Sequence, residues 1–75
     1  MTRKEFLHAL DKLMELPQGT LKGPENLNDL ERWNSLGMIS FIALVDANNR
    51  VKLSPTQIMS SVTVSDLLEV AQVEP

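Results

Sequence analysis

Two residues that favour the start of a helix, Asn34 and Ser35, stand side by side before an apolar run that opens at Leu36. A helix uses one N-cap, whose side-chain oxygen accepts a hydrogen bond from a backbone N–H of the first turn. If Ser35 is the cap, its hydroxyl is engaged in structure and nothing more follows. If Asn34 is the cap, Ser35 becomes the first helical residue and presents a free hydroxyl, which is a nucleophile. A phosphate attached there would be favoured, because unsatisfied N–H groups and the positive end of the helix dipole converge on that position.

The flanking apolar residues favour the second arrangement. With Asn34 as the cap, Trp33 and Met38 fall in the two positions of a hydrophobic staple, and Gly37 leaves the approach to Ser35 uncrowded. Three other predicted helices also begin with a capping residue between two staple residues, and each of them has a capping box. The boxes are Thr2 with Glu5, Ser54 with Gln57 and Thr63 with Asp66, and the staples are Met1 with Phe6, Leu53 with Ile58 and Val62 with Leu67.

The spacing of apolar residues predicts four helices around these starts. The first runs from about Arg3 to Glu15, because Pro17 disfavours helical geometry at Leu16. The second runs from Ser35 to Ala47, where Asn48 and Asn49 supply a residue tolerant of left-handed geometry. The third is short and ends near Ser60, and the last follows Thr63 and turns Leu67, Leu68, Val70 and Ala71 inward.

A long connection, residues 16–33, separates the first two helices. Connections of this length in a compact domain are functional or contain a short element. Leu27, Leu30 and Trp33, spaced three apart, predict a turn or two of helix that docks on the bundle. We expect Leu16 and Leu21 to hold the rest of the connection down.

The second helix has two unlike faces. Steps of about 100° per residue place four bulky residues on the core side, namely Met38, Phe41, Ile42 and Val45. The outward side carries small uncharged residues, namely Gly37, Ser40, Ala43 and Ala47. An ordinary surface helix shows Lys or Glu there, so this face is predicted to meet a partner protein; the alternative is that another part of the chain covers it.

Composition excludes several classes of function. The chain has 75 residues, no cysteine, one histidine and a net charge of −3, with 10 acidic and 7 scattered basic side chains. Disulfides, a zinc site and a nucleic-acid partner are therefore not expected. No apolar run approaches the length that spans a bilayer, and MTRKEF lacks the apolar core of a signal peptide, so no membrane insertion and a cytoplasmic location are expected. We expect one domain over residues 1–75, acting as a monomer.

An enzymatic function is also not expected. His8 lies in the middle of the first predicted helix, with no spacing that ties it to a serine. The acidic residues are dispersed, so no pair of carboxylates indicates acid-base chemistry.

The run LERWNSLGMISFIALVD, residues 30–46, resembles the modification motif of acyl carrier proteins, in which an Asp-Ser-Leu triplet opens the second helix. Ser35 and Leu36 match directly, and TVSDLLEVA, residues 63–71, is similar to the opening of the family's last helix. The resemblance also covers the length, the long first loop and the short third helix. It implies an all-α fold, a four-helix bundle of acyl-carrier type, in which Ser35 carries 4'-phosphopantetheine and Asn34 and Leu36 flank the attachment site.

A carrier of this family holds acyl groups as thioesters and performs no chemistry itself. The implied partners are a phosphopantetheinyl transferase and acyl-transferring or acyl-modifying enzymes. The expected walls of an acyl pocket are Met38, Phe41 and Ile42 of the second helix with Ile58, Met59 and Val62 around the third. Two alternatives stay open: a peptidyl or aminoacyl carrier, and an unmodified helical protein-interaction module.

Three positions depart from the family pattern. Asn34 stands where the family has aspartate, and Gly37 and Ser40 stand where members of fatty acid synthesis usually show acidic residues. An asparagine caps a helix about as well as an aspartate, so the fold should not suffer. Because the acidic recognition face is largely missing, we expect a specialised biosynthetic pathway with its own partner enzymes.

Overall fold

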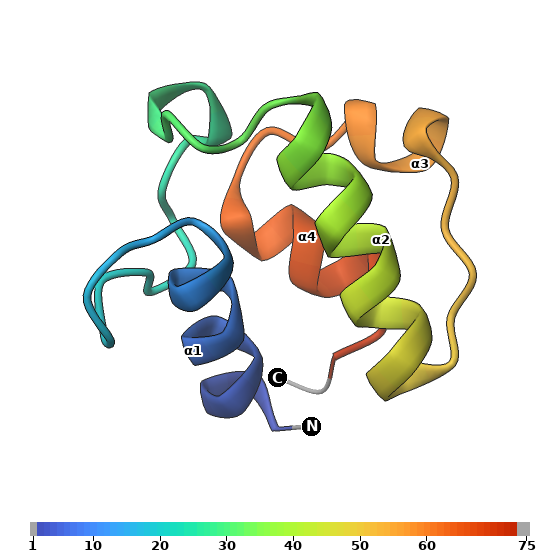
Figure 1. Cartoon of the computed structure of the whole chain (residues 1–75), viewed down its shortest axis with the longest axis horizontal. Helices are drawn as coiled ribbons and strands as arrows, with labels where there is room; N and C mark the ends of the chain where they lie inside the picture. The colour runs from blue at the N-terminus through green and yellow to red at the C-terminus, as the bar shows by residue number, and fades with distance from the viewer. Residues whose placement is uncertain (1, 74–75) are drawn as a thin grey trace.

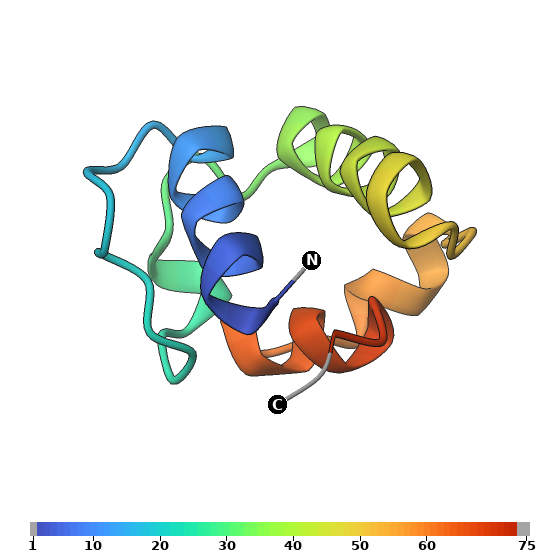
Figure 2. The same ribbon diagram turned by 90° about the horizontal axis from the view of Figure 1, so that it is seen from below.

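The structure is a computed structural model and describes residues 2–73. Within them the chain forms four α-helices and one turn of 3₁₀ helix and no strand, so the fold is all-α, as predicted. The elements are α1 (Arg3–Leu13), η1 (Leu27–Asp29), α2 (Ser35–Asn49), α3 (Pro55–Met59) and α4 (Val64–Val70). Figures 1 and 2 show α1, α2 and α4 arranged around a common interior, with the connection between α1 and α2 on the outer side of α1. No helix in this part of the chain has the length and apolar character needed to cross a membrane.

Helix α1 begins as predicted and ends earlier. The Thr2 hydroxyl accepts from the Glu5 N–H at 3.1 Å, and the Glu5 carboxylate accepts from the Thr2 N–H at 3.0 Å. Met1, the expected staple residue, lies outside the described residues. The predicted end at Glu15 is wrong, because the helix stops at Leu13 and Glu15 adopts a left-handed conformation with φ of 58°. Such a residue ends a helix and turns the chain back, here two positions before Pro17.

Helix α2 is two residues longer than predicted, since it includes both asparagines. Arg50, with φ of 57°, is the left-handed residue that ends it. The Asn48 side-chain amide donates to the Leu44 carbonyl, and the Asn49 amide donates to the Ala71 carbonyl just after α4, each at 2.9 Å. Asn49 therefore joins the ends of two helices instead of reversing the chain.

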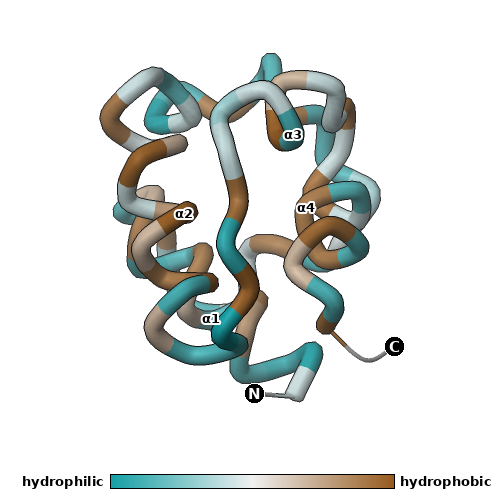
Figure 3. Tube along the Cα trace, turned by 90° about the vertical axis from the view of Figure 1, so that its right-hand side faces the viewer, coloured by the Kyte–Doolittle hydropathy of each residue, from teal (hydrophilic) through white to brown (hydrophobic). Residues whose placement is uncertain are grey.

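The starts of α3 and α4 follow the predicted capping chemistry. The Gln57 side chain accepts from the Ser54 N–H at 2.8 Å, and the Asp66 carboxylate accepts from the Thr63 N–H at 3.0 Å. The segment leading to α3 alternates exposed and inward residues, with Lys52 outside and Leu53 buried, and Figure 3 shows this alternation of hydropathy between α2 and α3. The predicted staple at α4 is wrong, because Val62 is 54% exposed whereas Leu67 is fully buried.

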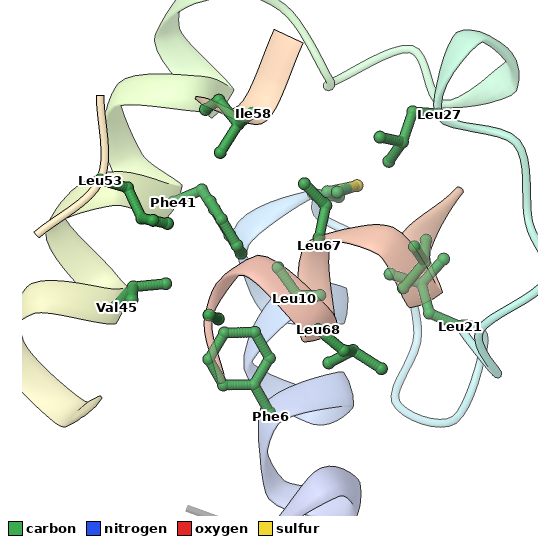
Figure 4. Packing of buried hydrophobic residues seen from close by; sticks show 13 residues of the cluster. Phe6, Leu10, Leu21, Leu27, Phe41, Val45, Leu53, Ile58, Leu67 and Leu68 are labelled. Carbon is green, nitrogen blue, oxygen red and sulfur yellow. The ribbon is translucent and has the colours of Figure 1, made fainter. Parts of the chain in front are cut away.

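The core is a single cluster of buried apolar side chains drawn from every helix and from the connection (Figure 4). Its members are Phe6, Leu10, Met14, Leu21, Leu27, Phe41, Val45, Leu53, Ile58, Val64, Leu67, Leu68 and Ala71. Leu21 and Leu27 confirm that the connection is pinned down, while Leu16, Leu30 and Trp33 pack against the cluster from its edge. Burial of these side chains provides the main driving force for folding.

One charged side chain, Asp11, is buried with this core and organises the connection. Its carboxylate accepts from the Gly19 N–H at 2.8 Å and from the Leu21 N–H at 2.9 Å. Asp11 is 1% exposed, and each of its two carboxylate oxygens accepts one of these hydrogen bonds. Its place in the sequence, four residues after Leu7 and three before Met14, puts it on the apolar stripe of α1.

The connection also pairs with the backbone that leads into α4. The Leu27 N–H donates to the Val62 carbonyl at 2.9 Å, and the Val64 N–H donates to the Glu25 carbonyl at 3.0 Å. Burial raises the pKa of Glu25, but the N–H groups of Gly23 and Lys22 outweigh burial by binding its carboxylate, so the net pKa lies below the ordinary value. These contacts connect η1 and α4 directly and hold the polypeptide that approaches α2.

Candidate functional site

Asn34, and not Ser35, is the N-cap of α2, which confirms the prediction made from the staple residues. The Asn34 backbone is extended and its side-chain oxygen accepts from the Gly37 N–H at 3.0 Å. Trp33 and Met38, the expected staple pair, both pack against the core. Ser35 is consequently the first helical residue, and it is exposed. The geometry leaves the Ser35 hydroxyl outside the capping interaction, at the positive end of a helix of 15 residues.

Gly37 plays a different role from the predicted one. It is buried, so its assignment to the outward partner face is wrong. A Cβ built at this position would lie inside 3.0 Å of the Arg32 backbone carbonyl oxygen. Only glycine admits this close approach, which seats the segment before Asn34 against the first turn of α2. The other three residues of the predicted face, Ser40, Ala43 and Ala47, are exposed.

The outer face of α2 is more apolar than the prediction allowed. Leu36 is 72% exposed and Ile39 is 62% exposed, and their spacing of three places both on one side of the helix. Ile39 was missed by sequence reasoning, although its spacing of three from Leu36 and four from Ala43 is the signal that finds it. Leu36 immediately follows Ser35, so this apolar face begins beside the candidate attachment site.

The six predicted pocket residues do not share one environment. Phe41 and Ile58 are fully buried, Met38 and Ile42 are half-buried at the edge of the core, and Met59 and Val62 are exposed. Met59 and Val62, which were predicted as walls of an acyl pocket, therefore face solvent in this structure. Helix α3 has five residues, so one side chain, that of Ile58, takes its inward position and the next residue turns out toward solvent.

A small hollow of about 100 Å³ is lined by the two sequence neighbours of Ser35, Asn34 and Leu36, but not by Ser35 itself. Its lining residues are Leu13, Glu15, Arg32, Asn34, Leu36, Gly37 and Ser40. Arg32 and Glu15 form an ion pair at 2.8 Å with both side chains more than half exposed, so the pair adds little to stability. It connects the segment before the cap with the end of α1 and thereby borders the site on one side.

The electrostatics of the site favour an attached anion. The first turn of α2 carries no acidic side chain, and Asp46 near the other end is the sole ionisable residue of the helix. No acidic side chain of α2 itself therefore compensates its dipole at Ser35. His8, the one histidine, pairs its Nδ1 with the Gln18 side-chain amide at 3.2 Å. Residues 2–73 contain no group of three or more histidine, cysteine or acidic side chains arranged to hold a metal ion.

Comparison with known proteins finds no family model, no curated protein and no solved structure that matches this chain.

Proposed function

We propose that this protein is a carrier of the acyl carrier type, modified on Ser35 with 4'-phosphopantetheine. In the modification, Ser35 Oγ forms a bond to the phosphorus that bears the pantetheine arm of coenzyme A. The pyrophosphate bond breaks, adenosine 3',5'-bisphosphate leaves, and a base of the transferase accepts the serine proton. The terminal thiol of the arm then holds an acyl group as a thioester for partner enzymes. The chain itself is not an enzyme in this proposal.

The proposal rests on one observation: Asn34 caps α2, and Ser35 is left as an exposed first helical residue. A serine that caps a helix has its hydroxyl oxygen occupied by a backbone N–H. Here the Asn34 side chain accepts from the Gly37 N–H, so Ser35 is exposed and not required as the cap. The resemblance of residues 30–46 to the family's modification motif supplies the identity of the attached group.

The exposed apolar residues of α2 support docking of partner enzymes beside the attachment site. Leu36 and Ile39 are both more than 60% exposed, whereas Asp46 is the sole charge on the helix. Docking through shape and apolar contact is expected to respond weakly to salt, because screening acts on charge pairs. A steep loss of partner affinity with ionic strength would contradict this mode of docking.

The near absence of charge on the exposed face of α2 also indicates the kind of biosynthetic pathway that the proposed carrier would serve. Bulk fatty acid synthesis uses acidic recognition residues at the positions held here by Gly37 and Ser40, as the resemblance implies. Of these two positions only Ser40 is exposed in this structure, and it carries no charge. We infer a specialised pathway, such as modification of a secondary metabolite or of a cell-envelope component. Ready acceptance of this chain by general synthase enzymes would argue against that inference.

A second candidate is an unmodified helical module that binds another protein. The exposure of Leu36, Ile39 and Met59, at 72%, 62% and 71%, favours a protein-binding surface whether or not Ser35 is modified. The two functions differ in one property, the covalent modification of Ser35. A peptidyl or aminoacyl carrier differs from an acyl carrier in its cargo and not in this property.

Intact-mass measurement distinguishes these functions. The protein is incubated with coenzyme A, magnesium and a broad-specificity phosphopantetheinyl transferase, together with Asn34→Asp and Ser35→Ala variants. We expect one phosphopantetheine group on the wild-type chain, faster modification of Asn34→Asp, and none on Ser35→Ala. Modification that persists in Ser35→Ala would refute the site. No modification even of Asn34→Asp would favour the interaction module.

A further inference from the structure

A groove of about 490 Å³ lies between the first two turns of α1 and the connection, and cationic side chains gather around it. Arg3 and Lys4 line this basic groove from α1, and Lys22 lines it from the connection, together with His8. The chain has a net charge of −3 and 7 lysine and arginine residues in all. Three of the seven border this one groove, and no acidic side chain of residues 2–73 does. The basic residues are scattered along the sequence, and the fold brings these three together.

Direct contacts between α1 and the connection hold the two sides of the basic groove. Arg3 Nη2 donates to the Lys22 carbonyl at 3.4 Å. The Arg3 guanidinium lies over Gly23, where a Cβ would come within 2.7 Å of the same nitrogen. The Asp11 carboxylate of α1 adds two hydrogen bonds from N–H groups of the connection, at 2.8 and 2.9 Å. The fold itself therefore forms the groove, and a partner does not have to assemble it.

The cations of the basic groove are available to a partner. Lys4 and Lys22 are exposed. The nearest carboxylates in the chain, those of Glu5 and Glu25, accept from backbone N–H groups at 2.8 or 3.0 Å. They reduce the positive potential of the groove but form no ion pair with a residue of 2–73, where the ion pair that does form lies beyond the other end of α1. An anionic partner thus meets lysines that no described carboxylate has paired.

The inner wall of the basic groove is apolar. Leu21 is 2% exposed and Leu7 is half-buried, and both line the groove. An apolar centre bordered by exposed polar groups is the usual arrangement of a protein–protein interface. No aromatic side chain of residues 2–73 lines the groove, so it lacks the stacking surface with which proteins bind single-stranded nucleic acid. The groove is therefore suited to a protein segment that carries both carboxylates and apolar side chains.

We propose that the basic groove binds an acidic segment of a partner protein, with carboxylates at its three cations and an apolar side chain against its two leucines. Figure 1 shows the starts of α1 and α2 at opposite ends of the molecule, so this surface is separate from Ser35. Binding here does not require modification of Ser35. It responds to salt, because it depends on charge, and this distinguishes it from docking on α2.

Fluorescence anisotropy with labelled peptides tests the proposal on the unmodified protein. The probe EELEELEE carries carboxylates and leucines, whereas QQLQQLQQ lacks the charges and EEGEEGEE lacks the leucines. We expect saturable binding of the probe at about 20 mM salt, about fivefold weaker binding at about 150 mM salt, and weaker binding of both control peptides. No saturable binding of EELEELEE at low salt, or equal binding of either control peptide, would overturn the proposal.

Replacement of the two exposed lysines locates the binding. Lys4→Gln and Lys22→Gln each remove one positive charge and should weaken binding of EELEELEE about 2- to 5-fold. Lys52→Gln is the matched control, because Lys52 is exposed on the segment before α3 and its replacement changes the net charge by the same amount. Circular dichroism verifies that all three variants fold. An equal loss of affinity in Lys52→Gln would show that net charge governs binding, and would overturn the assignment to the groove.

Two further ligands separate a protein segment from other anions. Tripolyphosphate and oligothymidylate are used as competitors of EELEELEE, and we expect both to bind more weakly than the peptide. Equal or tighter binding of tripolyphosphate would assign the groove to a small phosphate ligand, and equal or tighter binding of oligothymidylate would assign it to nucleic acid; either result overturns the proposal. Absence of enzymatic modification of Ser35 would overturn the proposed carrier function and leave these measurements valid.

Discussion

Replacement of Gly37 by alanine should destabilise the protein, although alanine is the better helix former. In an open helix position the change from glycine favours folding by up to about 1 kcal/mol. At Gly37 the new Cβ would lie inside 3.0 Å of the Arg32 carbonyl oxygen, which belongs to the backbone and cannot rotate away as a flexible side chain can. Overpacking costs about 1–3 kcal/mol, and a clash with backbone atoms belongs to the upper part of that range, about 2–3 kcal/mol. The clash is expected to exceed the gain, with a net loss of about 1–2 kcal/mol of unfolding free energy.

Thermal unfolding followed by circular dichroism measures this loss. For a domain of this size a loss of 1–2 kcal/mol lowers the melting temperature by about 4–16 °C. Ser40→Ala is the matched control, because Ser40 is exposed on the same helix and its replacement should change stability by less than about 0.5 kcal/mol. A Gly37→Ala protein that melts at or above the wild-type temperature would refute the close approach of Arg32 to α2.

Other replacements test the cap, the connection and the response to acid. Asn34→Ala should cost about 1 kcal/mol of unfolding free energy in urea titrations, whereas Asn34→Asp should match or exceed wild type by up to about 1 kcal/mol; equal losses would exclude the side-chain cap. Asp11→Ala leaves two backbone N–H groups without their acceptor and should cost about 2–4 kcal/mol in the same assay, so a loss below 1 kcal/mol would contradict the role of Asp11. The pKa of Asp66 is lowered, first by the Val62 N–H, and that of Glu5 first by the Thr2 N–H. Both carboxylates therefore stabilise the fold at neutral pH, and that contribution is lost as pH falls below about 4. Unfolding free energy that stays constant from pH 7 to 3, or an Asp66→Asn variant with the wild-type pH profile, would contradict this.

The helix starts could be predicted from the sequence because their chemistry is local. A cap, the third helical residue and two flanking apolar residues span only six positions, so Thr63 and Asp66 identify the start of α4 without knowledge of the rest of the fold. The same local device distinguished Asn34 from Ser35. Helix ends were less predictable, since Asn49 is bound to the end of α4 and that contact exists only in the folded chain.

Features that depend on distant contacts escaped prediction. The pairing of the connection with the backbone before α4 leaves no periodic signal in a segment that contains glycine and proline. The burial of Gly37 depends on the position of Arg32, which precedes the helix and lies outside its periodicity. The resemblance also implied more pocket walls around α3 than the structure buries, because Ile58 is the buried residue of this five-residue helix. Met59 was expected in a pocket wall, and its exposure of 71% was missed.

The contacts that present Ser35 also reach the core, so the position of Ser35 is physically coupled to the packing of the interior. The approach of Arg32 to Gly37 and the hydrogen bond of Asn34 hold the segment before the helix against its first turn. Trp33, within the same segment, is seated on Phe41. Movement of Phe41 would release Trp33 and disturb the backbone that positions Ser35. A replacement that displaces Phe41 is therefore expected to change the start of α2 as well as the core, because Trp33 joins the two.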